Sequence, residues 1–74
     1  MVQKSDMNKY WFNQDDLIKP IDWDYIRSLA KSIQDALELY MRGEISIGKA
    51  SEIARIPFRD LDMIRTKGRI PLNV

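Results

Sequence analysis

The residues of this chain best suited to chemistry are basic, and half of them lie near its C-terminal end. Residues 49–74 contain six Lys or Arg and three Asp or Glu, whereas residues 1–24 contain three and five. Guanidinium and ammonium groups bind phosphate, and an arginine can also read the edge of a guanine. The alternative is an ordinary solvated surface, because acidic residues interrupt the basic stretch at Glu52, Asp60 and Asp62. The basic residues are Lys49, Arg55, Arg59, Arg65, Lys67 and Arg69.

The composition argues against an enzyme. The chain has no histidine and no cysteine, which removes the commonest general base, the commonest metal ligand and every thiolate. The carboxylates of Asp15 and Asp16 are adjacent, so they point to different sides, and no nucleophile–base pair is evident. We therefore expect no catalytic residue, no metal and no cofactor.

The length of 74 residues allows one small domain. Such a domain is only marginally stable alone, so a homodimer or another protein partner is a reasonable expectation. No apolar run is long enough to span a membrane, and residues 1–6 lack the apolar core of a signal peptide. We expect a cytoplasmic protein with no membrane contact.

The basic residues must be positioned by helices, and the first predicted helix runs from Asp22 to Gly43. Asp22 can cap its first turn, Asp24 favours the helix dipole, and Gly43 can end the helix in the left-handed conformation. Apolar residues recur at the three-four spacing of a single helical face. They are Trp23, Ile26, Leu29, Ala30, Ile33, Leu37, Tyr40 and Met41.

Two shorter helices are predicted next. Ser46 can cap a helix over residues 47–54, and Pro57 breaks it and suits the first position of another helix that runs to about Lys67, with Gly68 as its cap. Residues 1–21 read as an N-terminal arm with one short strand or turn of helix near 9–18, and residues 70–74 as an extended tail that could pair as an edge strand. The expected fold is all-α: a small helical domain over 22–74 with a C-terminal helix-turn-helix at 46–67.

The helix-turn-helix is indicated by the spacing of small and apolar residues. One helix must bury small residues where the other crosses it, the turn must bury one apolar side chain, and the second helix must bury residues three apart. The residues that fit are Ala50, Ser51, Ala54, Ile56, Leu61 and Ile64. The alternative is an ordinary helical hairpin packed on the first helix.

A resemblance to a known family rests on residues 40–54, which read YMRGEISIGKASEIA. This run resembles a family of short archaeal and bacterial proteins, formerly uncharacterised, that carry Y-x-x-G-x-I-S-L-G-K-A-A-E-L-A-G and a G-I-P tail. The resemblance covers about residues 37–72. It implies a DNA-binding antitoxin of a toxin–antitoxin pair, with a ribonuclease toxin as partner.

The chain departs from that family pattern at three points. Arg55 stands where the turn usually has glycine, so it must take a less easy backbone conformation or open the turn. Pro57 stands where a capping serine is common, and Arg69 is an extra residue before Ile70 and Pro71. These departures concern the geometry of the turn more than the motif itself.

In a helix-turn-helix the second helix enters the major groove. Its outward residues predict base contacts from Arg59 to guanine, from Met63 and Thr66 to a thymine methyl, and from Asp62 to cytosine. Arg59 has an alternative as a surface arginine paired with Asp60 or Asp62. Phe58 also faces outward in this arrangement, unless it turns into the core. Phosphate contacts are predicted from Ser46, Lys49, Arg55, Arg65, Lys67 and Arg69.

The aromatic residues Tyr10, Trp11 and Phe12 are candidates for contact with a toxin or a second copy, because tryptophan and tyrosine are enriched at interface hot spots. The alternative is that they cover this chain's own small core. Two functions therefore remain open. The first is a DNA-binding transcriptional regulator of the antitoxin type; the second is a helical protein-interaction adaptor that binds no DNA, which the exposed Phe58, Asp60 and Asp62 favour.

Overall fold

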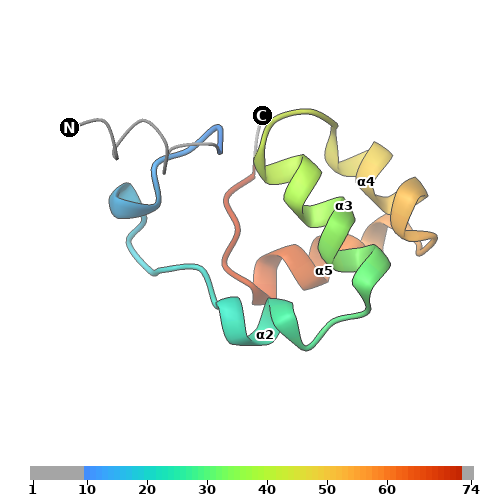
Figure 1. Cartoon of the computed structure of the whole chain (residues 1–74), viewed down its shortest axis with the longest axis horizontal. Helices are drawn as coiled ribbons and strands as arrows, with labels where there is room; N and C mark the ends of the chain where they lie inside the picture. The colour runs from blue at the N-terminus through green and yellow to red at the C-terminus, as the bar shows by residue number, and fades with distance from the viewer. Residues whose placement is uncertain (1–9, 73–74) are drawn as a thin grey trace.

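The computed structural model describes residues 10–72, and these form a small all-helical structure (Figure 1). Within this range there are four α-helices, one short 3-10 helix and no strand. Residues 1–9 of the expected arm and residues 73–74 of the expected tail lie outside the described part. The elements in chain order are η1 (Gln14–Asp16), α2 (Trp23–Arg27), α3 (Lys31–Met41), α4 (Ile47–Ala54) and α5 (Phe58–Lys67).

The prediction of one continuous first helix is wrong, because the chain breaks between α2 and α3. The hydroxyl of Ser28 donates to the carbonyl of Tyr25, and Ala30 has extended backbone angles of φ −58° and ψ 148°. The side-chain amide of Gln34 donates to the carbonyl of Leu29 at 2.7 Å. These side chains take the carbonyls that a continuing helix would use, so the chain turns without a glycine or a proline.

The core is centred on α3, which crosses in front of α5 in Figure 1. Its buried face consists of Ala36, Leu37, Tyr40 and Met41, each with at most 1% of its surface exposed. Gly43 ends α3 as predicted, with φ at +78°. The amides of Gly43 and Glu44 donate back to the carbonyls of Tyr40 and Leu39, which is the Schellman arrangement at a helix end.

The two shorter helices have the expected bounds, apart from the start of α5. Ser46 caps α4, and its side chain accepts a hydrogen bond from the amide of Lys49 at 3.1 Å. Pro57 was predicted to be the first residue of α5, but it is the N-cap residue, so the helix begins at Phe58. The two helices pack against each other, and α4 also packs against α3.

Gly68 is the C-cap residue of α5 as predicted, although its backbone is not left-handed. Gly68 has φ −79°, and the left-handed residue after α5 is Arg69, with φ +62°. A side chain at Gly68 would place its Cβ 3.4 Å from two carbon atoms of Ile26, so this glycine lets α5 lie close to α2. Its carbonyl also accepts from the amide of Asp22 at 3.0 Å.

Residues 10–21 lie along one edge of the molecule, next to the segment that follows α5 (Figure 1). Tyr10 and Ile21 are buried in the core, and the amide of Trp11 donates to the carbonyl of Met41 at 2.9 Å. The guanidinium of Arg69 donates to the carbonyl of Pro20 at 2.9 Å. This segment is therefore docked at both ends. None of the helices within residues 10–72 has the length and apolar character needed to cross a membrane.

Candidate nucleic-acid interface

The inward residues of α4 and α5 lie where the sequence pattern placed them. Ala50 and Leu61 are fully buried and Ala54 is 5% exposed, while Ile56 and Ile64 are partly buried against the same core. The buried hydroxyl of Ser51 donates to the carbonyl of Gly48 at 2.7 Å, so this small polar residue is satisfied inside the contact. One face of each helix is thereby held on the core, and the opposite face is available.

The outer face of α5 carries the four predicted base-contact residues. At 100° per residue, Arg59, Met63 and Thr66 lie opposite the buried Leu61, and Asp62 lies at the margin of that face. Met63 is 53% exposed, and Arg59 and Thr66 are also exposed. Phe58, at the first position of α5, is 52% exposed, so it does not turn into the core.

Arg59 is an exposed charged group on this face. Its side chain makes no ion pair and no hydrogen bond with residues 10–72. The alternative of a pair with Asp62 is not found, because Asp62 accepts from Arg65 at 2.9 Å instead. A guanidinium without an internal partner keeps all of its donors for an external acceptor.

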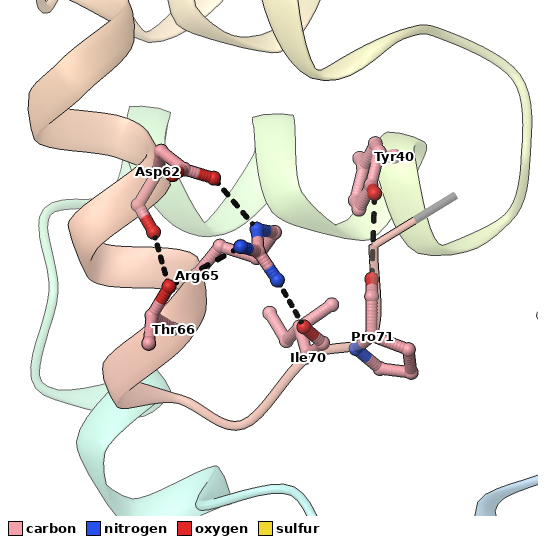
Figure 2. Close-up of polar contacts among 6 residues, drawn as sticks. All are labelled: Tyr40, Asp62, Arg65, Thr66, Ile70 and Pro71. Atoms are coloured by element: carbon pink, nitrogen blue, oxygen red, sulfur yellow. Dashed lines mark hydrogen bonds and ion pairs between the residues drawn. The ribbon is translucent and has the colours of Figure 1, made fainter. Parts of the chain in front are cut away.

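Arg65 faces inward, unlike the phosphate contact that the sequence suggested. Its side chain is only 14% exposed, and its guanidinium lies between Asp62 and the carbonyl of Ile70 (Figure 2). The physical reason is its position on α5 beside Leu61, close to where the chain returns after the helix. Asp62 and Arg65 are three residues apart on one helix, a spacing that allows this ion pair, although it was not predicted from the sequence. Nothing local to the sequence indicated the contact with Ile70.

The other predicted phosphate contacts differ in how free they are. Lys49, Arg55 and Lys67 are exposed, although Lys49 lies 3.5 Å from a carboxylate oxygen of Glu52. Arg69 is partly engaged by Pro20 and, at 3.9 Å, by Asp22. The hydroxyl of Ser46 is the cap of α4, so any anion near it would meet backbone amides of the first turn.

The aromatic residues proposed for a partner lie on this chain's own core. Tyr10 is buried, and Trp11 meets Tyr40 edge to face with ring centroids 6.3 Å apart. Phe12 stacks on Tyr10 at 5.5 Å. The alternative that these residues cover an internal core is what the structure shows, and we do not retain them as a partner surface.

The hydroxyl of Tyr10 also reaches α3. It donates to a carboxylate oxygen of Glu38 at 3.0 Å. Burial, followed by this hydrogen bond and the negative charge of Glu38, raises the pKa of Tyr10 from 10.0 to about 12. The role of Glu38 in holding residues 10–12 was not apparent from the sequence.

Comparisons of this chain with protein-family models, with curated proteins and with solved structures found no match. The resemblance of residues 40–54 to the antitoxin family therefore stays an expectation. Within residues 10–72 there is also no group of three or more acidic side chains placed to hold a metal ion. The interpretation of the outer face of α5 has to rest on its own chemistry.

Proposed function

We propose that the protein is a DNA-binding regulator in which α4 and α5 form a helix-turn-helix and α5 enters the major groove. The observation that carries this proposal is the outer face of α5, where Arg59 has no partner among residues 10–72 and the opposite side is anchored by the buried Leu61. An arginine on a rigid helix can bond O6 and N7 of guanine together. Met63 and the methyl group of Thr66 are apolar groups suited to a thymine methyl.

The exposed basic residues supply the phosphate contacts in this proposal. Lys49 lies on α4, Arg55 on the turn after α4, and Lys67 at the end of α5. In the sequence they therefore stand on both sides of the residues that form the outer face of α5. Arg69, whose guanidinium is partly engaged by Pro20 and Asp22, is a further candidate, while Arg65 is assigned no phosphate. Because phosphate contacts release counterions, each should contribute about 0.9 to the slope of log affinity against log salt.

The test is binding to a duplex that covers the DNA upstream of the protein's own gene, measured by gel shift over a range of salt concentrations. We expect Arg59→Gln to reduce the preference for that duplex over an unrelated one, and Lys67→Gln to weaken both alike. Arg27→Gln is the matched control, since Arg27 is exposed on α2 and belongs to neither set. Absence of binding, or binding independent of salt, would overturn the proposal.

The assignment as an antitoxin rests on the resemblance and on DNA binding together. In this proposal the regulator is cytoplasmic, binds its operator as a homodimer, and also holds a ribonuclease toxin. The check is co-purification with the product of a neighbouring gene that encodes a small ribonuclease with an acidic active site. Sedimentation equilibrium tests the dimer, and a monomer that is independent of concentration would exclude it.

A second candidate function is a helical adaptor that binds protein instead of DNA. The exposed side chains of Phe58 and Met63, each about half accessible, are the observation that favours it. An adaptor would lose its partner on Phe58→Ala and Met63→Ala and would be indifferent to Lys67→Gln. A DNA-binding regulator would instead bind DNA more weakly on Lys67→Gln. The gel-shift series therefore separates the two functions.

A further inference from the structure

Arg65 makes three contacts with three different nitrogen atoms (Figure 2). Its Nε donates to Oδ1 of Asp62 at 2.9 Å, one terminal nitrogen donates to the carbonyl of Ile70 at 2.8 Å, and the other donates to the hydroxyl of Thr66 at 3.2 Å. A guanidinium is rigid and planar, so these three acceptors are held in one fixed arrangement. Two of them belong to the outer face of α5.

The segment after α5 is fixed to the helix by the same residue. The amide of Ile70 donates to the backbone carbonyl of Arg65 at 3.1 Å, while the Arg65 side chain donates to the carbonyl of Ile70. Ile70 is 2% exposed, and the next carbonyl, of Pro71, accepts from the hydroxyl of Tyr40 at 3.3 Å. Arg65 therefore connects α5 to a segment that is itself anchored on α3.

These contacts decide what Asp62 and Thr66 present to the outside. One oxygen of Asp62 is occupied by Arg65, so its charge is compensated and its other oxygen is left for an external donor. The hydroxyl of Thr66 donates to the carbonyl of Asp62 at 2.9 Å and accepts from Arg65. The donor of Thr66 is thereby used, so its methyl group and one hydroxyl lone pair are left for an external partner.

We propose that Arg65 is a positioning residue that fixes Asp62 and Thr66 for base recognition and makes this recognition depend on the segment at Ile70. The inference rests on the proposed function and deepens it. Arg65, which the sequence suggested as a phosphate contact, instead sets specificity without touching DNA. It also accounts for a carboxylate on a face that meets phosphates, since the charge of Asp62 is balanced within the molecule.

The test compares Arg65→Lys with Lys67→Gln on the upstream duplex and on a set of its single-base-pair variants. A lysine has its three donors on one nitrogen atom and cannot reproduce the planar fork by which three separate nitrogens of Arg65 reach three acceptors. Discrimination at the base pairs next to Asp62 and Thr66 should therefore fall about fivefold to tenfold. The salt slope should stay unchanged. Lys67→Gln should do the opposite, lowering the slope by about 0.9 and leaving the base preference intact.

Two outcomes would overturn the proposal. In the first, Arg65→Lys lowers the salt slope as much as Lys67→Gln does and leaves the base preference unchanged, so that Arg65 contacts a phosphate. In the second, Asp62→Asn leaves the base preference unchanged. Asp62→Asn also serves if Arg65→Lys does not fold, because Asp62 is at the surface, with 40% of its side chain exposed, and the bond from Arg65 to Ile70 remains.

The structural part can be measured without DNA, in the full chain, by NMR of ¹⁵N-labelled arginine side chains. The Nε–H of Arg65 should exchange slowly with solvent, and Asp62→Asn should accelerate that exchange. Rapid exchange in the unsubstituted protein would overturn the arrangement around Arg65 whatever the protein binds. Failure of the unsubstituted protein to bind any duplex, with slow exchange intact, would instead overturn the proposed function and with it the role of Arg65 in specificity.

Discussion

Two arginines take the left-handed backbone conformation, Arg55 with φ +61° and Arg69 with φ +62°. Each stands at the end of a helix in the position that Gly43 occupies after α3. At Arg55 the following amide, of Ile56, donates back to the carbonyl of Ser51 at 3.2 Å, and Ile70 donates in the same way to Arg65. A side chain in this conformation costs about 1–2 kcal/mol, so both positions retain a charge at the expense of stability.

Replacing Arg55 by glycine should therefore raise the stability of the protein while weakening its binding to DNA. We expect Arg55→Gly to raise the free energy of unfolding by about 0.5–1 kcal/mol, because the relief of backbone strain exceeds the extra entropy of the unfolded chain. Urea denaturation measures this change. The same substitution should lower the salt slope of DNA binding by about 0.9 if Arg55 contacts a phosphate.

Arg55→Asn is the matched control for that prediction. Asparagine tolerates the left-handed region better than arginine does but less well than glycine, so its stabilisation should be smaller. Its effect on DNA binding should equal that of glycine, because both remove the charge. A loss of stability in Arg55→Gly would contradict the assignment of strain at this turn.

The helix ends that are set by residues close in the sequence were predictable. Ser46 and Pro57 fix where α4 and α5 begin through local hydrogen bonding and the geometry of proline. The bounds of α4 are the expected ones, and α5 begins one residue later than expected. The break between α2 and α3 was not predictable from spacing. It depends on Gln34 reaching back to Leu29, and the apolar spacing continues across the break.

The same distinction applies to the candidate site. The exposure of Arg59 and Met63 followed from helical periodicity once Leu61 was placed inside. The inward position of Arg65 did not, because its third partner is the carbonyl of Ile70, which lies beyond the helix and is brought back by tertiary packing.

The contact between residues 10–12 and α3 predicts a dependence of stability on pH. The pKa of Tyr10 is raised in the folded protein, so folding favours its neutral form. The resulting stabilisation is fully present below pH 10, the unfolded value, and is lost as the pH rises towards about 12. We expect Tyr10→Phe to be less stable than the unsubstituted protein at pH 8 and the difference to shrink above pH 10.

Urea denaturation of both proteins from pH 8 to pH 12 tests this prediction. Every other titratable group is the same in both proteins, so the difference between the two isolates Tyr10. The titration itself can be followed by NMR of ¹³C-labelled tyrosine. An ordinary pKa for Tyr10, near 10, would show that the hydrogen bond to Glu38 is not formed in solution.

At the scale of the whole molecule, the helices are covered along one edge by the segment 10–21. This segment contributes Tyr10, Trp11 and Phe12 to the core and is held at its far end by Arg69. A domain of this size has a small core, with a free energy of unfolding of roughly 5–10 kcal/mol. We therefore expect residues 10–20 to provide a large part of its stability.

Deleting residues 1–20 should lower the free energy of unfolding by about 3–6 kcal/mol relative to a chain that lacks only residues 1–9, because burying each large apolar side chain contributes about 1.5–3 kcal/mol. Comparison of the two truncated chains isolates the described segment 10–20. Urea denaturation followed by circular dichroism measures the difference, and near-ultraviolet spectra report whether the remaining helices keep fixed packing. Equal stability of the two chains would mean that the aromatic residues do not belong to the core in solution and would return them to the candidates for a partner surface.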